Sequence, residues 1–396
     1  MTESLLRPAL VLGLLSCVGP FAIDMYLPAM PAIGADLGAS VPAMQGTITA
    51  YFIAFGLAQL IYGPWADQAG RKLPIYVGVS VFLVGSLICT LAGSVEALSA
   101  GRFIQGLGGA AVMVIPRAII RDMYTGHAAT RLMAAIMLVI SVSPMLAPLA
   151  GSGLIAVADW RAIFGVLAAA AVVSLLMTRF LLEETLPKED RQPVAARALL
   201  AGAKVLFRDP LFLGLTFIGG FGMASFFVFI ASASFVYTEA FGLSPTGFSL
   251  AFALNAIGFF AASQLAAGFG LRFGAPRVIA WATAGFAFWT VALLGLGLLG
   301  VANLWVTLAG LFLANACLGL VIPTTMVMAL DEHGDIAGLA SSLGGTLQML
   351  AGGAMIAATG PFFDGTVVPM LAAIALCGVA SFVLARLVLG RQAVTV

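Results

Sequence analysis

The chain has 396 residues, of which 62% are hydrophobic and only 9% are charged, and its formal net charge is +1. A water-soluble domain needs much more charge on its surface, so this composition excludes one. The near-neutral balance also argues against a nucleic-acid partner, because nucleic-acid binding requires a basic surface.

The apolar residues fall into about twelve runs of about 20 residues each, the length that a helix needs to cross a bilayer. Charged residues and clusters of proline and glycine separate the runs. The predicted spans lie near residues 8–30, 44–62, 73–94, 97–118, 132–156, 162–182, 211–236, 246–269, 276–299, 304–328, 338–360 and 367–389. The sequence therefore predicts an all-α polytopic membrane protein.

The first span carries Asp24, the only acidic residue well inside any predicted span. A carboxylate in hydrocarbon is costly and is by default a functional candidate. Pro28 and Pro31 follow it and predict an irregular backbone that is packed within the protein. The alternative interpretation places Asp24 nearer the interface, where it would only cap a helix.

The second span is followed by a charged, turn-forming segment, Gly63-Pro64-Trp65-Ala66-Asp67-Gln68-Ala69-Gly70-Arg71-Lys72. Its glycines and proline predict a helix, a tight loop and a second helix. This places Asp67, Arg71 and Lys72 at the water boundary. The alternative interpretation is an ordinary basic loop between two membrane helices.

The fourth span contains a base, Arg102, at about the same distance from its outer end as Asp24 is from the outer end of the first span. At 1.5 Å rise per residue both would lie about 9 Å deep, so the two charges could meet across a cavity. The glycines that follow, at 106, 108 and 109, are not preceded by a strand. They therefore indicate close helix packing rather than a dinucleotide-binding loop.

The fifth span contains Pro144 and Pro148, with Gly151 after them. Two prolines four residues apart would give a kinked face on which another helix could pack and pivot. A simple proline kink explains the stretch equally well.

The two halves of the chain show a weak internal repeat. Residues 267–277 resemble the 63–72 segment, with Gly274 aligned to Gly70 and Leu271 in place of the aspartate. Residues 183–209 form the longest polar interruption and lie near the midpoint. We therefore expect an N-terminal six-helix half at 1–182, a linker at 183–209 and a C-terminal six-helix half at 210–396, related by an axis along the membrane normal.

Lysine and arginine fall almost entirely on alternate loops. One set of loops holds Arg71, Lys72, Arg121, Arg131, Lys188, Arg191, Arg197, Lys204, Arg208, Arg272 and Arg277, whereas the opposite set holds a single base, Arg161. Positively charged loops stay on the cytoplasmic side of a membrane. Both termini are therefore expected in the cytoplasm.

Several of these features occur in the order and at the span positions of a known family. They are Asp24 with Leu27-Pro28-Ala29-Met30-Pro31, the 63–72 segment, Arg102 with Gln105-Gly106, Arg121-Asp122, and Pro144 with Pro148 and Gly151. Together they resemble the twelve-span drug–proton antiporters of the major facilitator superfamily, and most closely the Bcr/CflA subfamily of bicyclomycin and chloramphenicol exporters. Two positions depart from the family pattern: Trp65 stands where a small aliphatic residue is usual, and Gln68 where a base is usual.

The resemblance implies two pseudo-symmetric six-helix halves that rock about a central cavity, in the inner membrane of a bacterium. It implies that Asp24 takes up and releases the coupling proton and that Arg102 influences that carboxyl. It also implies a conformational-switch segment in which Gly63, Asp67, Gly70, Arg71, Lys72 and Asp122 hold the outward-open state, and a pivot at Pro144, Pro148 and Gly151. The proton would be the only coupling ion, with no cofactor, and each chain would work as a monomer on an amphipathic, drug-like substrate.

The central cavity should be mainly aromatic and aliphatic, with a few polar groups. The candidates are Tyr26, Tyr51, Phe55, Gln59 and Gln105 in the first half, and Phe226, Phe227, Tyr237, Asn255 and Gln348 in the second. Helix packing or lipid contact is an alternative for each of them. Asn255 and Gln348 could equally form hydrogen bonds between helices.

Other classes of function are less consistent with the sequence. The two histidines, His127 and His333, lack partners at metal-ligand or triad spacing, and the four cysteines lie singly within apolar runs. We therefore expect neither an enzyme nor a metal site. A channel is also less consistent with the sequence, because it contains no ring or repeat of charged residues that could line a pore. A facilitator or proton symporter for a small metabolite on the same fold is the principal alternative to an antiporter.

Overall fold

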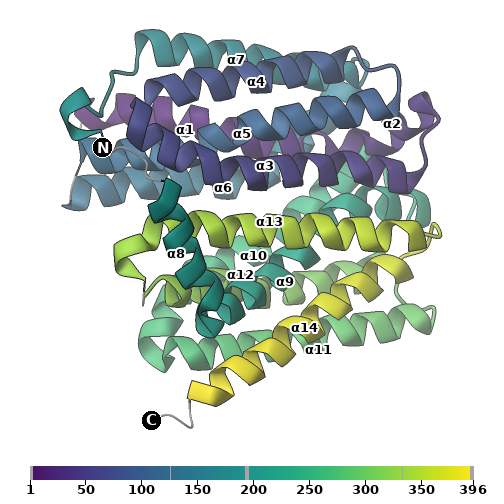
Figure 1. The fold of residues 1–396 in the computed structure, drawn as a ribbon. Helices are drawn as coiled ribbons and strands as arrows, with labels where there is room; N and C mark the ends of the chain where they lie inside the picture. The colour runs from purple at the N-terminus through teal and green to yellow at the C-terminus, as the bar shows by residue number, and fades with distance from the viewer. Residues whose placement is uncertain (1–2, 125, 192–195, 332, 393–396) are drawn as a thin grey trace. The chain divides into compact units, whose positions relative to one another are not determined.

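The computed structural model describes residues 3–124, 126–191, 196–331 and 333–392, and within these ranges the chain forms helices and no β-strand (Figure 1). The chain divides into two compact units, residues 1–198 and 199–396, so the division falls inside the polar interruption. The expectation of an all-α fold is confirmed.

The described residues of the first unit form six long helical stretches. Its elements are α1 (Glu3–Asp24), the 3-10 turn Leu27–Ala29, α2 (Met30–Leu37), α3 (Val41–Ala69), α4 (Lys72–Thr90), α5 (Val95–Met123), α6 (Gly126–Ile155) and α7 (Arg161–Phe180). The connection to the second unit carries a 3-10 turn at Lys188–Asp190 and the helix α8 (Ala196–Arg208).

The second unit repeats this plan. Its elements are α9 (Pro210–Phe235) with a π-helical turn at Val236–Ala240, α10 (Pro245–Phe273), α11 (Ala275–Leu298), α12 (Leu304–Asp331), a 3-10 turn at Gly334–Ile336, α13 (Ala337–Thr359), a 3-10 turn at Gly360–Phe362 and α14 (Val368–Gln392).

The pattern of helix neighbours is the same in both units. In the first, α3 and α4 pack on α5, α4 packs on α7, and α1 packs on α6. In the second, α10 and α11 pack on α12, α11 packs on α14, and α9 packs on α13. The weak repeat read from the sequence therefore corresponds to a repeated arrangement of helices, and Gly70 (φ 91°) and Gly274 (φ 84°) occupy matching turns.

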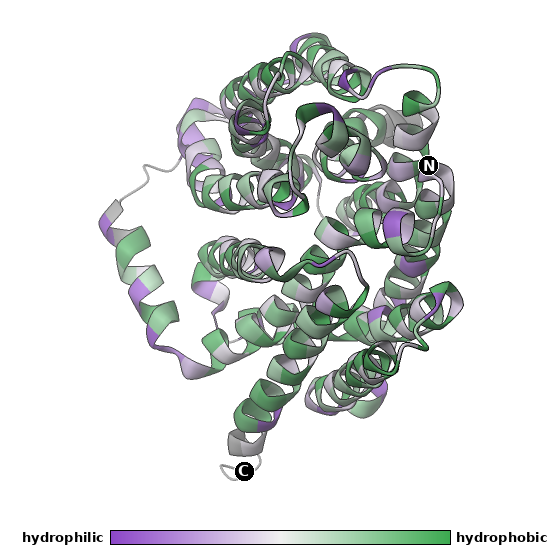
Figure 2. Cartoon of the chain, turned by 90° about the vertical axis from the view of Figure 1, so that its right-hand side faces the viewer, coloured by the Kyte–Doolittle hydropathy of each residue, from purple (hydrophilic) through white to green (hydrophobic). Residues whose placement is uncertain are grey.

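Eleven helical segments of the described chain are long and apolar enough to cross a membrane. The remaining predicted span, near residues 338–360, corresponds to α13, whose 23 residues are long enough to cross. Its apolar residues are diluted by glycine, serine, threonine and Gln348. Hydrophobic residues dominate the helices of both units (Figure 2). The protein is therefore a multi-pass membrane protein.

The prediction of a loop within residues 63–72 was wrong about the length of that loop. Helix α3 continues through Gly63 and Pro64 to Ala69, so that only Gly70 and Arg71 separate it from α4. Pro64 removes one backbone hydrogen bond, but the helix-compatible residues after it restore the pattern. Gly70 then ends the helix, because its φ of 91° is a conformation that glycine adopts without strain.

The single base expected on the outer loops, Arg161, is paired with acidic neighbours. Its Nη1 lies 3.1 Å from Asp36 Oδ2 and 3.3 Å from Asp159 Oδ1, and its Nη2 donates to the carbonyl of Ala92. Arg161 therefore ties together three connections at this end of the first unit, and its charge is balanced there.

Candidate functional site

Asp24 is the last residue of α1, at a break in the first span. The chain turns at Met25 and Tyr26 and then forms the 3-10 turn and α2, as the prolines predicted. The Asp24 side chain is buried, and among the described residues it has no hydrogen-bond or ion-pair partner. It lies close to the midpoint of the span Pro8–Leu37, and therefore farther from the end of the span than the predicted bounds, 8–30, had placed it.

Helix α6 makes close contact beside this break. A Cβ atom added at Gly151 would lie 2.1 Å from the carbonyl oxygen of Met25, the residue after Asp24. No side chain larger than hydrogen fits at that distance. Gly151 therefore lets the backbone of α6 lie directly against the end of α1, and Pro144 and Pro148 lie earlier in the same helix.

Arg102 on α5 is fully buried and binds the end of α1 rather than Asp24. Its Nη1 donates to the carbonyl of Ala22 at 2.9 Å and also to the side-chain oxygen of Gln105. Because carbonyls at a helix C-terminus carry partial negative charge, this is a favourable place for a cation. The sequence allowed Arg102 and Asp24 to meet, but no ion pair or hydrogen bond joins them among the described residues.

Two tyrosines enclose the guanidinium group of Arg102. Its Cζ lies 4.9 Å from the ring centre of Tyr26 and 4.4 Å from that of Tyr51, which are cation–π distances. Its Nε and Nη2 atoms have no hydrogen-bond partner among the described residues. Burying a cation with unpaired N–H donors costs free energy, so a negative charge that develops nearby would be stabilised by these donors. We call Tyr26, Tyr51, Arg102 and Gln105 the Arg102 network.

Further polar groups complete the Arg102 network. The hydroxyls of Tyr26 and Thr47 are 2.8 Å apart, the Tyr51 hydroxyl donates to the carbonyl of Gly19 at 3.4 Å, and Gln105 Nε2 donates to Ser86 Oγ at 2.8 Å. Sequence reasoning missed Thr47 and Ser86. Thr47 lies one helical turn before Tyr51, which is a weak signal, and Ser86 belongs to no motif.

A second group of charges lies at the other end of the first unit. Arg71 Nε and Nη2 donate to the two carboxylate oxygens of Asp122 at 2.6 and 3.0 Å, and its Nη1 donates to Asp67 Oδ1 at 2.5 Å. Burial alone would lower the pKa of Arg71, but its hydrogen bonds to Asp122 and Asp67 outweigh burial and raise that pKa. We call Asp67, Arg71 and Asp122 the Arg71 cluster; the structure brings together these three residues of the predicted switch segment.

Glu184, just after α7, is a further member of this region that the sequence did not reveal. Its carboxylate accepts hydrogen bonds from the backbone N–H groups of Arg71 at 2.8 Å and Lys72 at 3.2 Å, at the start of α4. Lys72 Nζ donates to the carbonyl of Leu182 at 2.7 Å. A Cβ atom at Gly70 would lie 2.7 Å from Glu184 Oε2, so glycine leaves room for this carboxylate as well as for the turn.

The predicted cavity residues of the first unit lie together. Tyr26, Tyr51 and Gln105 belong to the Arg102 network, and Phe55 stacks on Tyr51 with ring centres 5.9 Å apart. Gln59 follows Phe55 by one helical turn on α3, and its amide nitrogen has no hydrogen-bond partner among the described residues.

The predicted residues of the second unit join an aromatic cluster. Phe226 contacts Phe227 and stacks on Phe259, and Tyr237 contacts Phe229, Phe241 and Phe248. Asn255 donates to the carbonyl of Ala251, and its side-chain oxygen lies 3.5 Å from Asn315 Nδ2, which favours the interhelical hydrogen bond as its role. Gln348 of α13 lies against Gly219 of α9.

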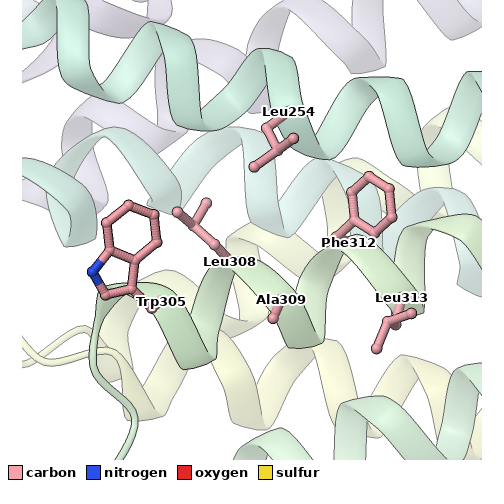
Figure 3. Close-up of a pocket in the computed structure, with 6 residues that line it drawn as sticks. All are labelled: Leu254, Trp305, Leu308, Ala309, Phe312 and Leu313. Atoms are coloured by element: carbon pink, nitrogen blue, oxygen red, sulfur yellow. The ribbon is translucent and has the colours of Figure 1, made fainter.

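One apolar groove of the second unit contains none of the predicted cavity residues in its lining. It has a volume of about 400 Å³ and lies between α10 and α12, lined by Leu254, Trp305, Leu308, Ala309, Phe312 and Leu313 (Figure 3). Trp305 is 75% exposed at its edge, and polar side chains are absent from its lining. In a membrane protein such a surface faces acyl chains, so we do not assign it to substrate binding.

The chain matches the model of the Major Facilitator Superfamily over residues 12–356. The uncharacterized MFS-type transporter YdgK of Bacillus subtilis (strain 168) is 32% identical over 364 residues, which are 91% of this chain and 90% of that protein. The bicyclomycin resistance protein homolog of Haemophilus influenzae is 30% identical over 377 residues (94% and 93%). Multidrug resistance protein D of Escherichia coli (strain K12) is 31% identical over 354 residues (87% and 86%).

Solved structures agree on the fold. The D-xylose-proton symporter superposes with a TM-score of 0.74 at 16% identity and covers 96% of both chains. A nucleoside transporter, NupG, gives the same TM-score at 14% identity, with 97% of this chain and 99% of that chain covered. The similarity that the sequence motifs predicted is therefore confirmed across nearly the whole chain: it belongs to the Major Facilitator Superfamily of membrane transporters.

Proposed function

We propose that this transporter expels drug-like small molecules in exchange for protons, by alternating access, with Asp24 as the protonation site. The observation that carries the proposal is the position of Asp24: a buried carboxyl that has no partner in the described part of the chain, at the end of the helix to which the buried Arg102 binds. The names of its relatives, a bicyclomycin resistance protein homolog and multidrug resistance proteins, support an exported antibiotic or drug as the substrate.

The Arg102 network gives this proposal a physical basis. A protonated, neutral Asp24 is compatible with burial, whereas an ionised one requires a nearby positive charge. Arg102 has two unused donor nitrogens close to the end of α1, and a cationic substrate would supply further positive charge. A proton and a substrate would then stabilise alternative states of one site, which couples their movements. The proton is the only coupling ion in this proposal, no cofactor takes part, and a single chain is the working unit.

Substrate-driven proton release separates this proposal from facilitated diffusion. The purified protein in weakly buffered detergent should release protons when it binds a compound that it expels from cells, as identified by a resistance and accumulation panel. A facilitator would bind the same compound without releasing protons. Transport direction in inside-out vesicles under an imposed pH gradient would distinguish antiport from symport.

We propose further that the Arg71 cluster controls the change of conformation, because it fixes the ends of α3, α4 and α5 together at one end of the first unit. Asp67→Asn removes one charge that binds Arg71, and Glu184→Gln weakens the acceptor for two N–H groups of α4. Each change should lower the transport rate several-fold while substrate affinity in detergent stays within a few-fold. Rates in proteoliposomes and binding titrations measure the two quantities.

Glu183→Gln is the matched control, because Glu183 is the exposed neighbour of Glu184 and has no side-chain partner among the described residues. It should transport at the wild-type rate. If Asp67→Asn or Glu184→Gln instead loses substrate affinity at a normal turnover rate, the cluster contributes to binding and the switch proposal is wrong.

The orientation proposed from the lysine and arginine distribution places α8 and both termini in the cytoplasm. Glu239 is exposed in the turn after α9, and Lys188 is exposed in the connection between the units. A cysteine at Glu239 should react with an impermeant thiol reagent added to intact cells, and one at Lys188 should react only after the cells are opened. The reverse labelling pattern would contradict the orientation.

A further inference from the structure

Helix α8 is fixed at the water boundary of the second unit. Only Asp209 separates it from α9, the first span of that unit. Asp209 Oδ1 accepts the N–H of Leu211 at 2.8 Å and so caps α9, and its Oδ2 lies 2.8 Å from His333 Nε2 in the connection between α12 and α13. Since a span begins at Pro210, α8 ends where the bilayer begins.

α8 runs across the spans of the second unit rather than parallel to them (Figures 1 and 2). One of its faces packs on the beginning of α13: Leu206 is fully buried, and Gly202 lies against the side chains of Leu339 and Ile336. These contacts hold α8 across the axes of the spans of this unit, which is the direction that a helix on the membrane surface would take.

The remaining surface of α8 combines basic and apolar side chains. Arg197, Lys204 and Arg208 are seven and four residues apart, so they form one exposed stripe opposite the packed face, and α8 contains no acidic residue. The more apolar flank of that stripe carries Leu200 (71% exposed) and Phe207 (50% exposed), seven residues apart, whereas the other flank carries Ala201 and the smaller Val205 (53% exposed). Large exposed apolar side chains outside the spans are costly in water and indicate a contact with an apolar phase.

We propose that α8 lies in the interfacial layer of the bilayer and binds anionic phospholipids. Leu200 and Phe207 would enter the boundary of the acyl chains, while the three bases would contact the phosphate groups of anionic headgroups. A soluble anion would satisfy the bases but would leave both apolar side chains in water. The surface therefore fits an anionic lipid bilayer, and this inference is independent of the proposed transport reaction.

The depth of α8 can be measured with two neighbouring positions that point to opposite flanks of the basic stripe. Leu200→Cys and Ala201→Cys, each in a background without the four native cysteines, carry a fluorescent label in phospholipid nanodiscs. The label at Leu200 should be quenched by lipid-borne nitroxides at least about threefold more than the label at Ala201, and aqueous iodide should show the opposite order. Equal quenching of both labels by iodide would overturn the proposal.

The dependence on lipid charge is the second arm of the experiment. In the Leu200-labelled protein, lipid-borne quenching should be about threefold stronger in nanodiscs containing phosphatidylglycerol than in purely zwitterionic ones, and the difference should shrink in 1 M salt. The combined variant Arg197→Gln, Lys204→Gln, Arg208→Gln should lose this difference, with an unchanged unfolding temperature because all three side chains are exposed. Quenching that is independent of lipid charge in the wild-type protein would overturn the assignment of anionic lipids.

Discussion

Asp24→Asn is expected to abolish transport against a gradient. Asparagine keeps the size of the side chain and one hydrogen-bonding oxygen but cannot exchange a proton, so it imitates the protonated state permanently. In proteoliposomes with an imposed pH gradient, the wild-type protein should concentrate its substrate, and the Asp24→Asn variant should bring the concentrations on the two sides only to equality. A neutral substrate should still bind this variant, and a cationic one should bind more weakly because its counter-charge is lost.

Asp36→Asn is the matched control. Asp36 lies in the same span, but it is about half exposed and pairs with Arg161 at the end of the first unit. This variant should still concentrate substrate in response to the gradient. If Asp24→Asn also does so, the coupling site lies elsewhere, and facilitated diffusion becomes the better account, since no other acid lies deep within a predicted span.

Gly151→Ala should destabilise the protein and stop transport, although alanine normally favours a helix over glycine. The added methyl group would lie 2.1 Å from the carbonyl oxygen of Met25, and a backbone atom cannot move aside as a flexible side chain can. Overpacking of this kind costs about 1–3 kcal/mol or more. Thermal unfolding in detergent and transport in proteoliposomes would measure the two effects.

Gly153→Ala, in the same helix, should have the opposite effect on stability. Apart from the backbone of its own helical turns, nothing described lies within 4 Å of a Cβ placed at Gly153, so alanine there should stabilise α6 by about 0.5–1 kcal/mol and leave transport unchanged. If both variants unfold at the wild-type temperature and transport normally, the close contact between α6 and the end of α1 is not required for function.

The properties of the fold that depend on local sequence could be predicted. Apolar runs of about 20 residues specify spanning helices by themselves, and the prolines after Asp24 correctly indicated the break that ends α1. The extent of the segment after Gly63 was wrong, because the propensity of residues 65–69 for helix outweighs the single bond lost at Pro64.

The site was predicted only where its residues belong to a recognisable motif. Arg71 and Asp122 could be named in advance, but Glu184 is 113 residues from Arg71, and its hydrogen bonds are to backbone N–H groups, which leave no trace in the sequence. Ser86 is a small polar residue of a kind that commonly bonds its own helix, as its hydroxyl does to the carbonyl of Phe82. The hydrogen bond from Arg102 to the carbonyl of Ala22 was also missed, because a backbone acceptor carries no sequence signal.

The central claim is that Asp24 exchanges the coupling proton, and the most direct test is proton release from the purified protein. Substrate is added to the wild-type protein and to the Asp24→Asn variant in weakly buffered detergent near neutral pH, and the change in pH is recorded with a dye. The account predicts that the wild-type protein releases protons in proportion to the substrate bound, and that Asp24→Asn binds a neutral substrate without releasing any. Equal proton release from the two proteins would contradict it.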